Sequence, residues 1–428
     1  MYLGYSSHKA GVLIVGILLL TQLLGMQKAK AQNVTSPYSI LGIGDIDTKD
    51  VGRYSVSGST GISRRNAISY NFSNPASLTS LAPKVMNFEL MGSGRISAFK
   101  SVGQDTLSAV SKDFVIRRIT MAFRNSAKTA FAFGLRPYSS VNYKYELPNA
   151  VYSDGTAGYS KTIEGSGGIN QVYGSFGYVL GENWSAGITA SYLFGSTQKN
   201  TTYTDALLNL DITKEEYSFY SGASVLGGLQ YYTRPGKRWQ HTVGLTVSAG
   251  TSLKGYAKTD YVQADSIFLT QSDGKALFKM PVSAGLGYTA TNRQGLSISL
   301  EADYYHWPYQ VINYTNSYTA PSVRFAAGWE YAKQAQYTLT NTSYEKYYLG
   351  MGLNAQNSYF YLNGAKIWEY AVTMGGGYNL SGNLYLHTGL EFGLRGFSSA
   401  GQVQERYTRF TLGFTIKDIW FRSRLGGN

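Results

Sequence analysis

Apolar and polar side chains alternate along most of the chain from Val85 onward. In residues 384–395, for example, every second position is apolar or Thr, and the positions between them are Tyr, His, Gly, Glu and Arg. Such period-two alternation predicts a β-strand with one apolar face. The run is longer than an ordinary strand of about five or six residues. It is long enough to supply the roughly 9–11 residues with which a tilted strand crosses a bilayer.

The same alternation recurs in about fourteen segments. They lie near residues 85–99, 114–124, 128–144, 168–180, 184–197, 217–232, 239–257, 279–290, 296–309, 322–332, 344–356, 367–379, 383–395 and 406–417. Arg117 interrupts the apolar face of the second segment. We place Arg117 near a lipid headgroup boundary, where a long side chain can reach water.

The connections between these segments alternate in length. Short ones lie at 125–127, 181–183, 233–238, 291–295 and 380–382, and long ones at 101–113, 145–167, 198–216, 258–278 and 310–321. The connection at 333–343 breaks the rule, because it is long where a short one is due. Short turns alternating with long external loops are typical of outer-membrane barrels. The pattern therefore predicts an all-β fold, a transmembrane antiparallel β-barrel of about 14 strands over residues 85–421. A soluble β-sandwich or β-helix is the alternative.

The N-terminus indicates export. Lys9 precedes the apolar run at residues 11–20, and Ala29 and Ala31 occupy the small-residue positions of a cleavage site. We expect residues 1–31 to be a signal peptide, and a membrane anchor is the alternative. Its removal takes away three lysines and no acid, so the formal charge falls from +13 to +10. We therefore expect an integral protein of the Gram-negative outer membrane, with a short periplasmic tail at 422–428 and contacts to lipid and lipopolysaccharide, and no nucleic-acid partner.

Composition agrees with such a barrel. The chain has 49 Gly and 37 Tyr residues, and only 15% of its residues are charged. Glycine suits close backbone approach, and tyrosine suits the aromatic belts at membrane interfaces. The chain has no Cys, which excludes a lipoprotein anchor and a disulfide framework.

A polar segment at residues 32–84 precedes the first strand and ends in an Asn-Pro-Ala turn formed by Asn74, Pro75 and Ala76. This stretch resembles the N-terminal hatch of the FadL family (the OMPP1/FadL/TodX type), and the part from Tyr344 onward looks like members from Bacteroidetes. The resemblance implies a hatch, or plug, inside the lumen, with Gly52, Arg53, Arg64 and Arg65 leading to the turn. A barrel of this size is too wide for its own side chains to fill, so a plug would prevent a leak.

The inner face of the expected strands carries charges of both signs: Glu89, Arg95, Arg118, Glu301, Asp303, Arg324, Glu330, Glu369, Glu391, Arg395 and Arg409. We hypothesise that Arg64 and Arg65 pair with wall carboxylates such as Glu369 or Glu391 and so hold the plug. Solvation of a wet interior is the alternative role of these charges.

The FadL resemblance implies transport of hydrophobic small molecules such as fatty acids. It implies capture by external loops, hatch movement and lateral release through the wall. The candidates for capture are Leu207, Leu208, Leu210, Ile267, Phe268 and Leu269. The alternative is a non-transporting structural or interaction barrel in an outer-membrane secretion or assembly machine. An elongated apolar cavity would favour transport, and a lumen packed with side chains would favour the alternative. In either case the barrel-assembly machinery is expected to insert the barrel.

Enzyme activity is not expected. The mature chain has three His residues, with no metal-type spacing and no phosphate-binding Gly motif, so we expect no metal and no cofactor. His387 and Glu391 share a strand face and could form an acid–base pair, but an ion pair facing the lumen is the simpler interpretation.

Overall fold

The computed structural model describes residues 36–419 except for 101–108, 152–156, 206–209, 234–237, 265, 313–316, 337–342, 363 and 398–401. The expected signal peptide and C-terminal tail lie outside these residues. Within the described ranges, the regular structure consists of β-strands and three short 3-10 helices. No helix in this part of the chain combines the length and apolar character that a membrane crossing requires.

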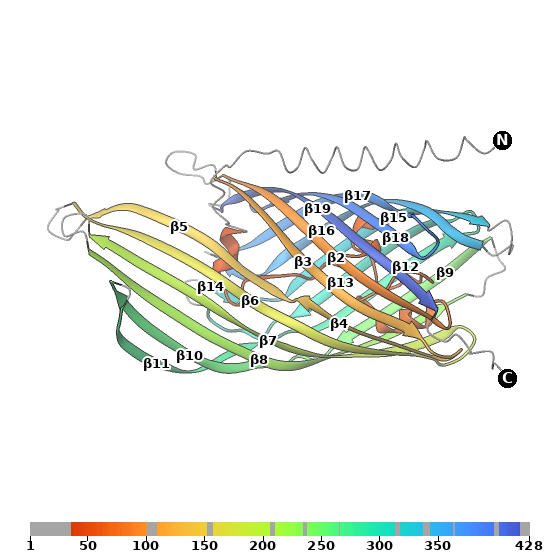
Figure 1. Cartoon of the computed structure of the whole chain (residues 1–428), viewed down its shortest axis with the longest axis horizontal. Coiled ribbons are helices and arrows are strands. Elements are labelled where there is room, and N and C mark those ends of the chain that lie inside the picture. Colours follow the sequence, from red (N-terminus) through yellow and green to blue (C-terminus); the bar gives the residue numbers. More distant parts are fainter. Residues whose placement is uncertain are drawn as a thin grey trace, which may run out of the picture. The chain divides into compact units, whose positions relative to one another are not determined.

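Fourteen of the described strands pair with antiparallel neighbours into a closed ring (Figure 1). In ring order they are β2 (Val85–Lys100), β3 (Ala109–Arg124), β4 (Thr129–Pro137), β6 (Ala157–Val179), β7 (Trp184–Asp205), β8 (Leu210–Tyr232), β9 (Trp239–Ser248), β12 (Val282–Asn292), β13 (Leu296–His306), β15 (Ser322–Gln336), β16 (Ser343–Leu362), β17 (Ala365–Asn379), β18 (Leu384–Arg395) and β19 (Gln404–Ile419). The last strand, β19, closes the ring on β2 along the full length of both. The predicted antiparallel barrel is confirmed.

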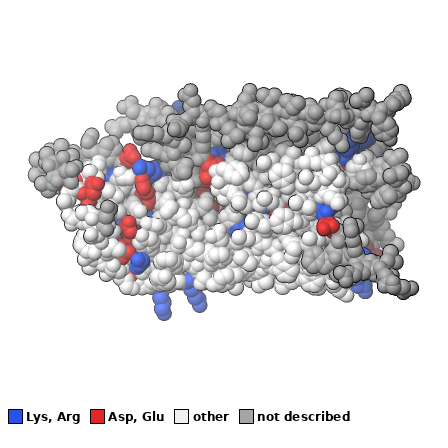
Figure 2. Space-filling model, in the orientation of Figure 1, with Lys and Arg blue, Asp and Glu red and all other residues white. Residues whose placement is uncertain are grey.

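The apolar faces of the strands point outward. Phe325, Leu353 and Phe392 are exposed on the outside, whereas the adjacent Arg324 and Glu391 are buried. Aromatic side chains of neighbouring strands also pair, Trp184 with Tyr231 and Phe219 with Tyr256, and aromatic side chains are enriched at membrane interfaces. On the visible face in Figure 2, most charged side chains gather at the end with the long hairpins. An outer surface of this kind suits a barrel embedded in lipid.

Several strands continue far beyond the apolar band. β6, β7 and β8 have 23, 22 and 23 residues, about twice the roughly 9–11 that a membrane crossing needs. β5 (Ser139–Val151) continues the path of β4, while β10 (Ser252–Gln263) and β11 (Ser266–Lys279) form a hairpin beyond β9 and β12.

The expected long loops at 145–167, 198–216 and 258–278 are therefore largely strand, and that part of the prediction is wrong. Backbone pairing continues beyond the membrane, where both faces meet water and the alternation of apolar and polar residues disappears. At 333–343 the strands likewise run on to Gln336 and from Ser343. The expected loop at 310–321 contains the short strand β14 (Ser317–Thr319).

Residues 36–84, which we call the N-terminal segment, run between the walls of the barrel (Figure 1). The segment contains η1 (Pro37–Ile40), β1 (Asp45–Ile46), η2 (Arg53–Ser57) and η3 (Pro75–Ser80). η2 contacts β15 to β18, and η3 contacts β6 to β8, so the segment touches both sides of the ring. Most of its side chains are buried, including Arg53 and Asn74.

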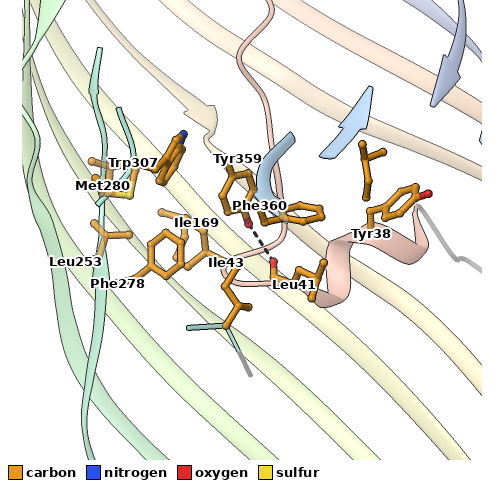
Figure 3. Close-up of a cluster of buried hydrophobic side chains, with 13 residues drawn as sticks. Tyr38, Leu41, Ile43, Ile169, Leu253, Phe278, Met280, Trp307, Tyr359 and Phe360 are labelled. Atoms are coloured by element: carbon orange, nitrogen blue, oxygen red, sulfur yellow. Dashed lines mark hydrogen bonds between the residues drawn. The ribbon is translucent and has the colours of Figure 1, made fainter. Parts of the chain in front are cut away.

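An apolar cluster fills the lumen between the start of this segment and the wall (Figure 3). Its buried members are Tyr38, Leu41, Ile43, Ile169, Leu193, Leu253, Phe278, Met280, Trp307, Ile312, Tyr359, Phe360 and Ile367. Tyr359 donates hydrogen bonds from its hydroxyl to the carbonyl oxygens of Leu41 and Gly44, both at 3.0 Å. These side chains pack against one another, so apolar residues in this part of the lumen form a core.

Candidate functional site

η2 places Arg53 at the centre of a buried ion-pair group. Its guanidinium lies 2.7 Å from Glu330 Oε1 of β15 and 2.5 Å from Glu345 Oε1 of β16. It also lies 4.1 Å from the centre of the Tyr348 ring. Arg64 Nη2 reaches the other oxygen of Glu330 at 2.5 Å. Two arginines of the N-terminal segment are thus clamped to two neighbouring wall strands.

Arg64 pairs with a wall carboxylate as predicted, but with Glu330 and not with Glu369 or Glu391, whereas the predicted ion pair of Arg65 is wrong. Arg65 donates only to neutral oxygens among the described residues, those of Ser185, Gln230 and Thr79. Burial lowers the pKa of Arg65 to about 10. The carboxylates of Glu369 and Glu391 are instead taken by Lys49, which the sequence did not single out.

Lys49 Nζ lies 2.6 Å from Glu369 Oε1 and 2.7 Å from Glu391 Oε1. It also donates to the Tyr407 hydroxyl at 3.2 Å. These groups are buried almost completely. Breaking such a pair leaves uncompensated buried charge, which costs several kcal/mol.

Further ion pairs connect the same segment to other strands. Asp50 pairs with Arg118, which also contacts Glu89 at 2.9 Å. The main-chain NH groups of Gly61 and Ile62 both donate to Glu301 at 2.7 Å. The remaining expected wall residues are also paired: Arg324 with Glu301 and Asp303, Arg395 with Asp45, Arg95 with Glu405, and Arg409 with Glu391.

Asn74 both caps η3 and ties it to the wall. Its Oδ1 accepts from the Ala76 NH at 3.0 Å, and Pro75 stands at the first position of the turn. Its Nδ2 donates to the carbonyl oxygens of Ile62, Leu229 and Leu245. A Cβ at Gly228 would lie 2.1 Å from Asn74 Oδ1, so the wall needs glycine there. The Asn-Pro-Ala turn therefore fits against β8 and β9.

Gly58 ends η2 in a left-handed conformation, with φ at +70°, and a Cβ there would lie 2.7 Å from the carbonyl oxygens of Ala327 and Leu353. We expect Gly58→Ala to lower the free energy of unfolding by about 2–4 kcal/mol, because conformational strain and overpacking add. Urea unfolding in lipid vesicles would measure the loss. Gly364→Ala is the matched control, since φ is +77° with no atom within 4 Å. Equal losses in both variants would contradict the close fit.

The barrel wall has a pairing gap beside this segment. β3 pairs with β4 only between Ile119 and Arg124, and the described edges at 109–118 and 139–151 share no strand pairing. Residues 36–49, which we call the strap, lie along the β5 edge. Asp45 and Ile46 pair with Ser140 and Ser139, and the Asp47 NH donates to the Tyr138 carbonyl at 2.9 Å. The strap therefore replaces part of the pairing that β3 does not make.

Arg117 points into this gap and not towards lipid headgroups, so its predicted place is wrong. The pairing of β2 and β3 shifts between Met91 and Gly92, which leaves Arg117 as the extra residue of a β-bulge. A bulge reverses the inward and outward alternation locally. Arg117 Nη2 consequently reaches Asp47 Oδ2 of the strap at 2.5 Å.

A cavity of about 140 Å³ lies behind the gap. A cavity of about this size is large enough for a molecule such as benzene, so the chemistry of its lining, and not its volume, decides what it can hold. Five cationic and four acidic residues help to line it: Lys49, Arg95, Arg117, Arg395, Arg409, Asp45, Asp47, Asp113 and Glu369. Burying an apolar molecule among so many charges would strip them of water without compensation.

His387 does not contact Glu391 as the sequence suggested. Its Nδ1 lies 2.7 Å from the Tyr348 hydroxyl, and its Nε2 lies 2.8 Å from the Thr415 hydroxyl. Of the expected capture residues, Leu207 and Leu208 lie outside the described residues. Leu210 is in β8, and Ile267, Phe268 and Leu269 are exposed on β11, far along a strand and not in a loop.

Comparisons with known proteins agree on the fold. The model of the family described as BamG matches residues 13–425. No curated protein matches the chain in sequence. A FadL homologue of Pseudomonas aeruginosa has a TM-score of 0.56 at 11% identity, over 88% of this chain and 99% of its own.

Two toluene transporters are similar in structure. TodX of Pseudomonas putida has a TM-score of 0.56 at 15% identity, over 88% of this chain and 99% of its own. TbuX of Ralstonia pickettii has a TM-score of 0.55 at 14% identity, over 86% and 98%. At these identities the likeness concerns the barrel fold.

Proposed function

Because this chain belongs to the BamG family, we propose that it is an integral outer-membrane barrel that acts as a closed, non-transporting subunit of a machine that assembles or exports outer-membrane proteins. The family name supports the barrel-assembly machinery as its partner. Lipid and lipopolysaccharide surround the barrel. The single observation that carries the proposal is that the N-terminal segment is buried between the walls of the barrel and contacts both sides of the ring.

Protein side chains occupy much of the described part of the lumen. Its apolar side chains form the packed cluster around Tyr359. Beside this cluster lies a cavity of about 140 Å³ whose lining includes nine charged residues. Lys49, Asp50 and Arg53 then fix the segment to at least five strands through buried ion pairs. Displacing the plug would separate several buried ion pairs at once.

Transport of hydrophobic small molecules is the second candidate, and the likeness to TodX and TbuX favours it. In that case a fatty-acid-like or hydrocarbon ligand would enter at the exposed apolar residues of β11. The strap would then leave the β5 edge and release the ligand sideways through the pairing gap. This candidate requires the plug to move, whereas a closed subunit does not.

A disulfide lock separates the two functions. A Cβ at Gly350 would lie 3.7 Å from Val56 Cβ, which suits a disulfide at about 3.8 Å, and the chain has no other Cys. We expect cells carrying Val56→Cys/Gly350→Cys to assemble outer-membrane barrels at wild-type levels when the bond is oxidised. The measurement is the amount of folded, heat-modifiable outer-membrane protein, together with copurification of the barrel-assembly machinery.

Uptake of a radiolabelled hydrocarbon is followed in the same strain, with Val56→Cys alone as the control. Uptake that stops on oxidation and returns on reduction, with barrel assembly untouched by deletion of the gene, would establish transport and overturn the proposal.

A further inference from the structure

Two arginines from two wall strands contact one carboxylate of the strap, and a third arginine, Arg409, lines the same cavity. Arg117 Nη2 lies 2.5 Å from Asp47 Oδ2, and Arg136 Nη2 lies 3.6 Å from the same oxygen and 2.8 Å from the Asp47 carbonyl. Arg409 also acts electrostatically on Asp47. These arginines come from β3, β4 and β19, respectively.

The cations of this cluster share their carboxylate partners. Asp113, which lines the same cavity, lies opposite Arg95 in the pairing of β2 with β3. Arg409 contacts Glu391 only at 3.5 Å, while Glu391 lies 2.7 Å from Lys49. Arg409 also stands directly opposite Arg95 on β2, an unfavourable placement of like charges. Arg95 forms an ion pair with Glu405 at 2.6 Å. Arg117 and Arg136 both pair with the carboxylate of Asp47.

Two buried polar atoms of the cluster lack a well-formed hydrogen bond. Arg117 Nε is buried and has no hydrogen-bond partner, and Asp47 Oδ2 has none of good geometry. Burial alone would raise the pKa of Asp47, but Arg117, Arg136, Arg409 and Lys49 outweigh it and lower the pKa. The Asp47 carboxylate therefore does not use all the hydrogen-bond donors that the surrounding arginines offer.

We propose that Arg117, Arg136 and Arg409 form an oxyanion-binding site on the barrel wall, and that Asp47 occupies it as an internal ligand. The ligand that replaces Asp47 carries a phosphate group. Three guanidinium groups match the several oxygens of a phosphate, which accepts parallel hydrogen bonds from arginine. The phosphate is either a free anion in the lumen or the headgroup of an anionic lipid at the pairing gap. The site goes beyond the proposed function and does not depend on it.

Asp47→Asn tests this directly, because it removes the internal anion and keeps the strap's main-chain contacts. Inorganic phosphate is titrated into the purified full-length barrel in a non-ionic detergent and followed by calorimetry. In a second arm, native mass spectrometry compares retention of phosphatidic acid with that of phosphatidylcholine having the same acyl chains. We expect D47N to bind phosphate or phosphatidic acid about tenfold or more tightly than the wild type, because an occupied site lowers apparent affinity.

Two kinds of control fix the location. Asp47→Asn/Arg117→Gln and Asp47→Asn/Arg409→Gln should each lose the gain, and whichever of the two refolds carries this control. Asp50→Asn removes the same charge nearby, but Arg118 keeps Glu89, so no gain is expected. Gain in the phosphate arm alone identifies a free anion, and gain in the lipid arm alone identifies a headgroup. No gain in either arm, or an equal gain in D50N, would overturn the proposal.

Discussion

Arg53→Ala is expected to lower the free energy of unfolding of the barrel by about 3–5 kcal/mol. The substitution leaves Glu330 and Glu345 buried without their main cation, and Arg64 alone cannot reach both. Burial by itself would lower the pKa of Arg53, but the two carboxylates raise it well above its ordinary value. Arg53 is therefore a permanent charge whose removal the site cannot compensate by proton transfer.

Urea unfolding in lipid vesicles, followed by tryptophan fluorescence, measures this loss. In Arg53→Ala/Glu330→Gln/Glu345→Gln the stranded carboxylates are neutral, and we expect most of the stability to return. If the single variant is as stable as the wild type, the Arg53 ion pairs do not hold the segment in place.

Lys49→Glu is expected to expel the strap and open the lumen. Three carboxylates would then share the space in which Lys49 now lies between Glu369 and Glu391, and like charges so close together cannot all stay ionised. Losing these pairs shifts the ratio of displaced to seated strap by about a hundredfold or more. We expect a steady ion conductance in planar bilayers that the wild type lacks.

Lys84→Glu is the matched control, because Lys84 carries the same charge at the exposed end of the same segment. The swapped pair Lys49→Glu/Glu391→Lys should restore a closed barrel. A folded Lys49→Glu protein without conductance would show that the plug stays in place without this contact.

The alternation of side chains was sufficient to predict the strands of the ring. At Phe325 and Leu353, for instance, the outward apolar side chain follows directly from the period of two, because lipid on one side imposes it. The same signal fails beyond the membrane. At Lys258 and Asp260 of β10, charged side chains break the apolar face although the strand continues.

The site was only partly accessible from the sequence. The period of two along a strand predicts that Glu330 and Glu391 point inward. It does not predict their ion-pair partners, because the N-terminal segment has no repeating pattern from which the positions of Lys49 or Asp47 could be inferred. Arg117 was misplaced because a β-bulge changes parity without a local marker. The only sign in the sequence was the charge of Arg117 on an otherwise apolar strand face. Such a charge indicates either the edge of the membrane or a β-bulge.

Closure of the first strand on the last has a consequence for biogenesis. β2 and β19 pair over 16 residues of each strand. The N-terminal segment, which lies inside the barrel, is synthesised before any strand of the ring. Once β2 and β19 have paired, the closed barrel has no opening wide enough for so long a segment of folded chain. The N-terminal segment must consequently enter the barrel before β2 pairs with β19. The machinery that inserts this protein into the bilayer therefore has to keep β2 and β19 apart until then.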